Sequence, residues 1–471
     1  MKIGVLLEEL INVAQISKTD FALSMNMTPS GLSKILTGRR LPFVKEKKSF
    51  SWQAAKYFSQ TIYSRNCYLK FKNVFPVVYD FNSAHELELF LAYAMEYSLD
   101  RAFEEENNTD FGYSDAELCF LGKRNILNML CIIASDYIVS HDANVPLDFY
   151  STLALFNRLQ ADILQRVKLL GTKQAVTFNH FIDLSNMEAA ASGKSAIGFL
   201  EKIVQAQEYV DLYLWQITKP IDSAFLLLKG RFLLLFSTQI DGTPMMSFIT
   251  HKGYVPSFFN ALMKKDAKKI SFNRQEAIGY LEANPSCIDE LIGRRLAAAY
   301  NFISIGYLLE KEELEAAPGS SSIRESVLKL FHSVLTQETT FYVTVDAMIH
   351  FFATGKAIVP LLGAVDIAPH NRIPYLRRFD SHIDETSASK IKIVNSDLPK
   401  AAVLCAQGLS LVYSVDHTYQ VDKVHYFETD TINSILHGEI ADDPLKLLDF
   451  SPDLWDGYIR ELSSAARGFE I

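Results

Sequence analysis

The sequence predicts a multidomain α+β protein with an all-α N-terminal domain, a helical middle segment and two tandem related α/β modules. Its length of 471 residues allows roughly two to four domains. Helical spacing of apolar residues dominates to about residue 170 and then gives way to mixed helix and strand patterns. Two distant stretches also match at a constant offset, as tandem modules would. We therefore expect domains at residues 1–66, 67–285 and 286–471.

The composition is typical of a folded protein without membrane spans. Hydrophobic residues make up 49% of the chain and charged residues 21%, and charges at Lys229 and Arg231 interrupt the most apolar stretch, 224–237. Glu8 and Glu9 interrupt the apolar start of the chain, unlike in a signal peptide. The cysteines are odd in number and scattered, which predicts reduced thiols in a cytoplasmic protein. They are Cys67, Cys119, Cys131, Cys287 and Cys405.

The net charge of −9 is unevenly distributed along the chain. Residues 1–72 carry twelve basic and four acidic side chains, or +8, so the remaining residues carry −17. A basic N-terminal segment on an acidic body indicates that the N-terminal segment binds a polyanion. A solvated charged face is the alternative explanation.

Three short helices are expected in the basic segment. Residues 3–14 have apolar side chains at helical spacing, and Ser17 is placed as the N-cap of a second, shorter helix. Asn26 follows at a turn, where asparagine tolerates left-handed backbone. Thr28 and the proline after it open a third helix, which Gly38 ends. The third helix has an apolar face of Leu32, Ile35 and Leu36.

Residues 17–42 resemble the helix-turn-helix of the Cro/C1 (XRE-like) repressors. The shared features are a small residue in the second helix, apolar residues in the third and a basic ending, namely Ala22, Met27, Leu32, Ile35, Leu36, Gly38, Arg39, Arg40 and Pro42. Asn26 departs from the glycine usual at that turn. With a further helix over 52–63, the resemblance covers about 65 of the 471 residues.

The resemblance implies that the third helix lies in the major groove of DNA. The residues expected at or beside the base edges are Thr28, Pro29, Ser30, Gly31, Ser33 and Lys34. The residues expected at phosphates are Lys18, Thr19, Arg39 and Arg40. Lys34 is the best candidate for reading a base, because its ammonium group can donate to guanine O6 and N7. A helical hairpin that binds another protein is the alternative.

The predicted secondary structure of the body changes along the chain. Residues 67–80 are rich in β-forming side chains, and helices are expected over 84–104, 115–139 and 147–170. Strands follow at 176–182, 210–217 and 245–250, with a helix at 194–206. Residues 224–228 and 232–236 flank Lys229-Gly230 as a hairpin.

An internal repeat is indicated in the body. Residues 224–281 match 402–459 at a constant offset of 178, so Gly230 and Gly408 should both occupy hairpin turns and Phe272 and Phe450 should be equivalent buried anchors. Upstream, 191–194 match 353–356 at an offset of 162, which places an insertion in the second copy near 366–384. Coincidence between hairpin-rich stretches is the alternative.

Catalytic and metal-binding patterns are weak, so neither an enzyme, a cofactor nor a metal is expected. Gly193-Lys194-Ser195 lacks the first glycine of a phosphate-binding loop. Lys194 and Lys356 each follow a glycine and could hold an anion, although a glycine that ends a helix is the simpler explanation. The adjacent Asp416-His417 and the separate His425 have side chains that could bind a metal, but no further ligand is evident with them on the predicted hairpin.

These observations predict a DNA-binding transcriptional regulator. The basic N-terminal domain would bind an operator in double-stranded DNA, and the acidic body would bind a small-molecule or peptide effector and form a homodimer. The alternative is a regulator of the antitoxin or phage-repressor kind, whose body binds a protein partner. The many aromatic side chains could line an effector pocket, although aromatic residues at strand and helix spacing usually form the core.

Overall fold

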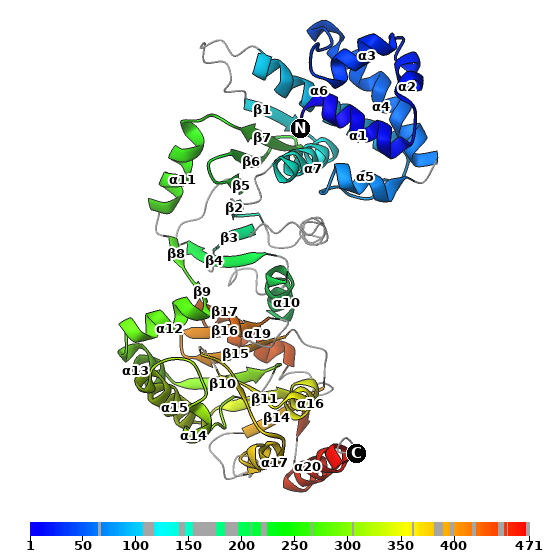
Figure 1. The fold of residues 1–471 in the computed structure, drawn as a ribbon. Coiled ribbons are helices and arrows are strands. Elements are labelled where there is room, and N and C mark those ends of the chain that lie inside the picture. Colours follow the sequence, from blue (N-terminus) through cyan, green and yellow to red (C-terminus); the bar gives the residue numbers. More distant parts are fainter. Residues whose placement is uncertain are drawn as a thin grey trace. The chain divides into compact units, whose positions relative to one another are not determined.

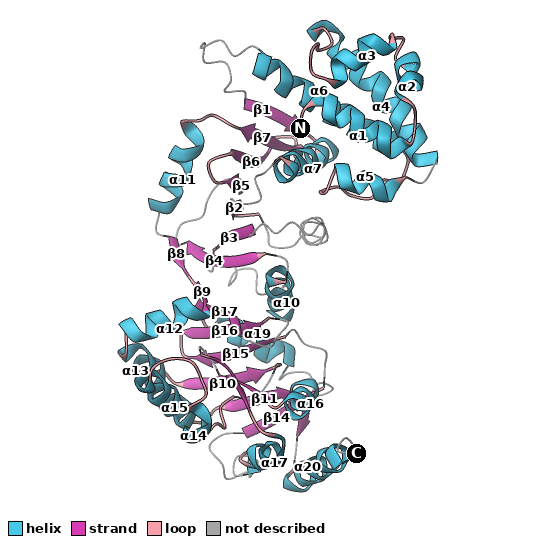
Figure 2. Cartoon of the chain, in the orientation of Figure 1, coloured by secondary structure: helices cyan, strands magenta, loops and turns pink. Residues whose placement is uncertain are grey.

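The computed structural model describes residues 1–64, 67–106, 117–140, 147–153, 176–183, 196–208, 210–217, 224–264, 267–303, 306–359, 362–380, 390–395, 400–416, 421–440, 447–449 and 451–467 (Figure 1). The predicted α+β class is confirmed, with helices at the N-terminus and mixed helix and strand afterwards (Figure 2). The chain forms two compact units. The first contains residues 1–179, 209–211 and 221–265, and the second contains 180–208, 212–220 and 266–471.

The N-terminal residues form a helical bundle as predicted. Its main helices are α1 (Ile3–Ala14), α2 (Lys18–Ser24), α3 (Pro29–Leu36) and α4 (Lys47–Ser64). The apolar side chains of α1 that recur at helical spacing, such as Leu6, Leu10 and Val13, are buried. Phe21 of α2 packs against Phe58 of α4, with ring centroids 4.6 Å apart, so aromatic side chains join α2 to α4 inside the bundle.

The β-rich prediction for 67–80 is wrong, because this segment contains helix α5 (Tyr68–Val74). Phe71, Val74 and Phe75 have the spacing of one helical face, and all three are buried. Their partner is Phe90 of α6 (Ala84–Glu106), whose ring centroid lies 5.0 Å from that of Phe75. Packing of aromatic side chains onto α6 therefore outweighs the β propensity of the segment.

Two segments that were predicted to be helical begin with strands instead. Residues expected in a helix over 115–139 form β1 (Glu117–Leu121) and then α7 (Lys123–Val139), with Gly122 at φ +84° between them. The helix expected over 147–170 begins as β2 (Leu147–Ser151), and the part from 154 onward lies outside the described residues. Both strands pair with partners about 75 to 130 residues away in sequence, which local periodicity does not reveal.

The remaining expected elements of the first α/β module are present. They are β3 (Val176–Ile182), α10 (Ala196–Gln207), β4 (Asp211–Ile217), β5 (Ala224–Leu228), β6 (Phe232–Thr238) and β7 (Pro244–Ile249). Helix α11 (Tyr254–Lys264) and strand β8 (Ala267–Lys269) follow. Within the first unit, neighbouring strands lie in the order β1-β7-β6-β5-β2, and every adjacent pair is antiparallel.

The second unit contains an eight-stranded mixed sheet. Its strand order is β18-β14-β11-β10-β15-β16-β17-β9. The strands are β9 (Ser271–Asn273), β10 (Leu296–Asn301), β11 (Thr340–Thr344), β14 (Lys390–Val394), β15 (Ala401–Ala406), β16 (Leu409–Val415), β17 (Val421–Phe427) and β18 (Leu447–Asp449). The accompanying helices include α12 (Arg274–Ala283), α13 (Ser286–Gly293), α15 (Ser321–Thr336), α16 (Val345–Thr354), α17 (Pro369–Arg377), α19 (Thr431–Ile440) and α20 (Pro452–Arg467).

The two sheets share a strand order, which supports the predicted repeat. Five neighbouring strands, β9-β17-β16-β15-β10, follow the same order and antiparallel pairing as β1-β7-β6-β5-β2. Gly230 and Gly408 occupy the two hairpin turns with φ of +71° and +70°, values that favour glycine. An order shared through turns and strand pairing is stronger support than the few identical residues in the sequence.

The end of the expected repeat differs from its prediction. Phe272 is only half-buried, and it lies in β9, where it pairs with Val424 of β17. Phe450, its predicted equivalent, lies outside the described residues. Residues 271–283, which were expected in the first module, therefore belong to the second unit and contain β9 of its sheet. The last segment of the second unit begins at residue 266 rather than at the expected 286.

Candidate nucleic-acid interface

The turn between α2 and α3 is built by the side chains that the sequence indicates. Ser17 Oγ accepts a hydrogen bond from the Asp20 backbone at 3.0 Å, and Thr28 Oγ1 accepts one from the Gly31 backbone at 3.1 Å. Pro29 is the first residue of α3, and Asn26 has φ of +52°. These contacts begin each helix and fix the reversal between them. The segment thus contains two short helices, α2 and α3, joined by a capped turn.

Helix α3 is held against the bundle along one side. Leu32 and Ile35 are buried, whereas Ser33 and Lys34 are exposed. Helix α3 also packs against α1. Gly4 of α1 approaches the end of α3 so closely that a Cβ atom on Gly4 would lie 2.3 Å from the carbonyl oxygen of Leu36. The bundle therefore presents one face of α3 to solvent.

The structure leaves most of the sequence-predicted residues of the head, which we define as residues 1–64, open to solvent. Thr28, Pro29, Ser30, Ser33, Lys34, Lys18, Thr19, Arg39 and Arg40 are exposed, and Gly31 is half-buried. Ser30 and Gly31 lie in the first turn of α3, while Lys34 lies in its last turn. A Cβ atom on Gly31 would lie 3.2 Å from Thr28 Oγ1, so the N-cap gives a steric reason for this glycine.

The cationic groups of the head differ in their surroundings. Lys18 Nζ lies 2.5 Å from Glu8 Oε1, and Arg40 stacks over the Phe43 ring at 5.4 Å. Lys34 and Arg39 are exposed. An exposed ion pair contributes little free energy, so Lys18 can exchange its carboxylate partner for another anion.

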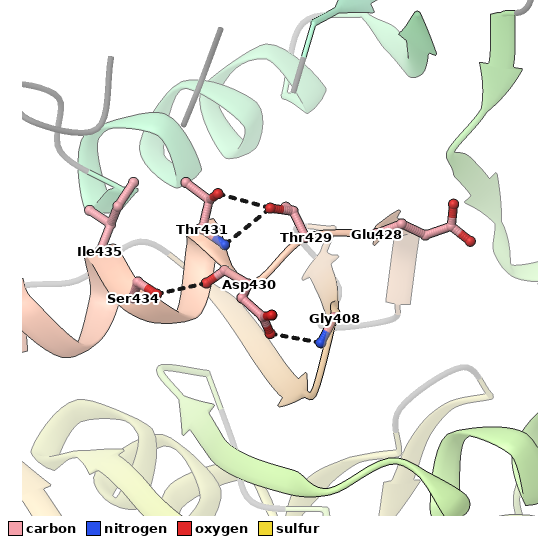
Figure 3. Close-up of a pocket in the computed structure, with 7 residues that line it drawn as sticks. All are labelled: Gly408, Glu428, Thr429, Asp430, Thr431, Ser434 and Ile435. Atoms are coloured by element: carbon pink, nitrogen blue, oxygen red, sulfur yellow. Dashed lines mark hydrogen bonds between the residues drawn. The ribbon is translucent and has the colours of Figure 1, made fainter. Parts of the chain in front are cut away.

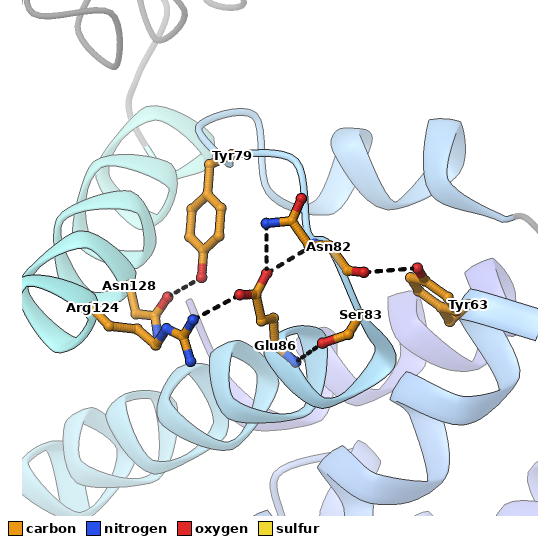
Figure 4. A network of polar contacts seen from close by, with 7 residues as sticks. All are labelled: Tyr63, Tyr79, Asn82, Ser83, Glu86, Arg124 and Asn128. Atoms are coloured by element: carbon orange, nitrogen blue, oxygen red, sulfur yellow. Dashed lines mark hydrogen bonds and ion pairs between the residues drawn. The ribbon is translucent and has the colours of Figure 1, made fainter.

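Polar contacts join the head to the first α/β module, and sequence reasoning missed them (Figure 4). Tyr63 of α4 donates to the carbonyl oxygen of Asn82 at 3.3 Å, and Glu86 accepts from the Asn82 backbone at 2.8 Å. Arg124 of α7 donates to the other oxygen of Glu86 at 2.7 Å. Farther along α6, Trp52 Nε1 donates to Glu96 at 3.1 Å. Helix α6 therefore connects the bundle to α7.

The weaker candidate sites lie only partly within the described residues. Gly355 ends α16 with φ of +73°, and Lys356 begins strand β12 (Lys356–Val359), as expected for a glycine that ends a helix. Gly193, Lys194, Ser195 and His417 lie outside the described residues. Within the part of the chain that the structure describes, no three potential ligands gather to hold a metal ion. Nor is any described helix long and apolar enough to cross a membrane.

A polar hollow of about 450 Å³ lies at the start of α19 (Figure 3). Asp430 accepts from the Gly408 backbone at 2.7 Å, and Ser434 Oγ donates to the carbonyl oxygen of Asp430 at 3.1 Å. The Thr429 hydroxyl accepts from the Thr431 backbone at 3.1 Å. These groups satisfy one another and cap the helix, so the hollow has a structural explanation.

No family model and no curated protein matches the chain. Two solved structures are distantly similar. One is polyphosphate kinase from Porphyromonas gingivalis, with a TM-score of 0.24 and 9% identity over 74% of this chain and 56% of that one. The other is TrmBL2, an archaeal chromatin protein with a novel mode of DNA binding, with a TM-score of 0.21 and 12% identity over 38% of this chain and 63% of that one.

This chain spans little more than half of either protein, and at these TM-scores neither likeness assigns a function. The likeness to a kinase nevertheless contradicts the expectation that the chain is not an enzyme, and that exclusion is withdrawn.

Proposed function

We propose that the protein is a DNA-binding transcriptional regulator of the XRE-like kind. The observation that supports this best is the capped helix-turn-helix, whose α3 exposes Ser30, Ser33 and Lys34. It lies in the segment 1–72, which carries a charge of +8. Helix geometry and charge together fit insertion of α3 into the major groove. The body would bind an effector and form a homodimer in the cytoplasm.

The exposed groups divide into two roles in this proposal. Lys34, from the outer face of α3, donates to base edges. Arg39 and Arg40, which follow α3, and Lys18 and Thr19, which begin α2, contact phosphates on either side of the groove. Phosphate contacts supply affinity without sequence preference, whereas base contacts supply specificity.

The rival proposal is a head that binds another protein. Leu23, Phe43 and Val44 are 62–67% exposed, and exposed apolar side chains favour a protein surface. Copurification of a stoichiometric partner through these residues, without retention on DNA, would favour this rival.

Substitutions at Lys34 and Arg39 should produce different binding signatures. Lys34→Ala should cost roughly 1 to 3 kcal/mol on the selected operator and relax preference at one base position, because a base contact is lost. Arg39→Ala should weaken binding to every sequence alike and reduce the salt slope by about one. The measurement is selection of the operator from random duplexes by the full chain, followed by titration at several salt concentrations.

Lys252→Ala is the matched control, because it removes an exposed lysine far from the helix-turn-helix in sequence. It should bind as the unsubstituted chain does. The groove assignment is overturned if the double substitution of Lys34 and Arg39 leaves operator affinity and salt slope unchanged.

The full chain should be dimeric when it binds DNA. One head contacts too little DNA for tight specific binding, and helix-turn-helix proteins commonly pair their heads on half-sites about one helical turn apart. Light scattering at micromolar concentration should therefore give about twice the chain mass of 53.2 kDa. A mass near 53.2 kDa with and without operator would contradict the dimer.

A further inference from the structure

A cavity of about 330 Å³ lies in the second unit, between α12, α13 and the face of strands β9, β17 and β16. Leu409, Leu411, Val424 and Tyr426 form its sheet side. Its volume is at the lower end of the range for small-molecule sites, which are concave, mostly apolar and have few polar groups. The cavity therefore has the size and lining of a ligand site.

The first α/β module has a sheet surface equivalent to the sheet side of this cavity, but in that module other side chains cover it. The β6–β7 ladder pairs Leu234 with Phe248, and the β16–β17 ladder pairs Leu411 with Tyr426. Counted from the two hairpin turns, where Leu228 pairs with Phe232 and Ala406 with Leu409, these pairs are equivalent. The second turn is one residue shorter, so the offset of 178 does not hold along β6 and β16. Counting along the same ladders makes Phe232 the equivalent of Leu409.

Aromatic rings cover this surface in the first module. The ring of Tyr137 lies 4.8 Å from that of Phe232, and the ring of Tyr97 lies 6.5 Å from that of Phe248. The guanidinium of Arg101 stacks 5.9 Å and 5.7 Å over the Tyr97 and Tyr137 rings. Tyr97 and Arg101 come from α6, which precedes the first sheet. In the first module this sheet surface is thus complementary to flat aromatic groups. The equivalent sheet surface in the second unit, which we call the floor, borders a cavity.

Cationic groups stand beside the floor in the second unit. Lys268 Nζ lies 5.6 Å over the Tyr426 ring and forms an ion pair with Glu428 at 2.9 Å. Arg294 donates to the carbonyl oxygen of Gln407 at 3.2 Å. Burial raises the pKa of Tyr426, and the positive charge of Arg294 opposes that rise. Lys269 adds a third cation, but its Nζ forms an ion pair with Glu276 at 2.7 Å. Arg294 is thus the cation of the lining that forms no ion pair among the described residues, and it faces the cavity with its charge not neutralised.

We propose that this cavity binds a small aromatic carboxylic acid. Its ring lies on Leu411 and Tyr426, where the first module has tyrosine rings, and its carboxylate accepts hydrogen bonds from Arg294. A guanidinium has five N–H groups in a planar fork that suits a carboxylate. The assignment of this ligand as the effector rests on the proposed function, but the binding site does not.

The probe for this site is 2-naphthoate, titrated calorimetrically into the full chain without DNA. The unsubstituted chain should bind it, and 2-naphthamide, which keeps the rings without the charge, should bind at least about tenfold more weakly. Arg294→Gln should weaken naphthoate binding by about tenfold or more and should remove the preference over naphthamide. Ala277→Phe, which fills the cavity from α12, should abolish binding of both.

Arg295→Gln is the matched control, because Arg295 is the next residue and its side chain is 77% exposed beside Glu338. It should bind naphthoate as the unsubstituted chain does. The proposal is overturned if the unsubstituted chain does not bind naphthoate, or if Arg294→Gln and Ala277→Phe chains with normal melting temperatures bind it unchanged. A chain that binds naphthoate and selects no DNA sequence would overturn the proposed function and leave this site standing.

Discussion

Replacing Gly4 by alanine is expected to destabilise the N-terminal bundle by roughly 2 to 3 kcal/mol and to weaken DNA binding with it. The new Cβ atom would lie 2.3 Å from the carbonyl oxygen of Leu36 and 2.8 Å from that of Ile35. Both contacts are with backbone, which cannot rotate away as a flexible side chain can. Helices α1 and α3 must therefore separate, and α3 loses the support that orients its exposed face.

The matched control is Gly279→Ala in α12, where a Cβ atom would meet no atom within 4 Å. An alanine in an open helical position favours folding by about 1 kcal/mol relative to glycine, so the two substitutions should change stability in opposite directions. Urea unfolding measures both, and hydrogen exchange should place the loss caused by Gly4→Ala in α1 and α3. Equal stability of the Gly4→Ala and unsubstituted chains would show that α1 and α3 do not pack as closely as described.

The parts of the fold that the sequence predicts correctly depend on local signals. Ser17, Thr28 and Pro29 mark helix starts through contacts with residues three positions away or less, and Asn26 takes the left-handed backbone expected of it. Gly230 and Gly408 likewise mark turns within single hairpins. Interactions of this range are visible in a short stretch of sequence.

The errors occur where distant segments decide the structure. The segment around Phe71 is rich in β-forming residues, but it becomes α5 because its aromatic side chains pack on α6. Strand β1 continues into α7 after one glycine, and it is a strand because it pairs with β7 more than 120 residues away. Such pairing depends on tertiary context, which outweighs intrinsic propensity.

The candidate sites show the same division. The exposed face of α3 follows from helical periodicity, so Ser33 and Lys34 could be placed there from the sequence. The cavity beside Tyr426 could not, because it depends on which sheet surfaces are covered by other segments. Tyr97 and Arg101 cover the equivalent surface from α6, and no sequence pattern links them to Phe248.

A buried histidine gives the second large expected effect. The side chain of His425 is fully buried in the second unit, with Nδ1 2.7 Å from Ser271 Oγ and Nε2 3.0 Å from Gln207 Nε2. Gln207 in turn accepts from Ser414 at 2.5 Å. Burial, with a smaller contribution from the charge of Lys423, lowers the pKa of His425 to about 3. The folded state therefore holds a neutral imidazole.

The second unit should lose stability as the pH falls below about 6.5, the ordinary pKa of histidine. Between that value and about 3, the unfolded chain binds a proton at His425 that the folded chain does not, so protonation favours unfolding. One such proton makes the free energy of unfolding fall by about 1.4 kcal/mol per pH unit. Burial also lowers the pKa of His180 to about 3, which adds a second proton to the same dependence.

His425→Gln should reduce the slope of the free energy of unfolding against pH by the contribution of one proton. A further His180→Phe substitution should remove the contribution of the other. The measurement is urea unfolding at pH 7, 6, 5 and 4, with each chain compared with itself at pH 7, so that a constant loss of stability from the substitution cancels. His370→Gln, at an exposed position of the same unit, should keep the slope of the unsubstituted chain. Parallel pH profiles for His425→Gln and the unsubstituted chain would show that folding does not lower the pKa of His425, and would contradict its burial in the hydrogen-bonded arrangement from Ser271 to Gln207.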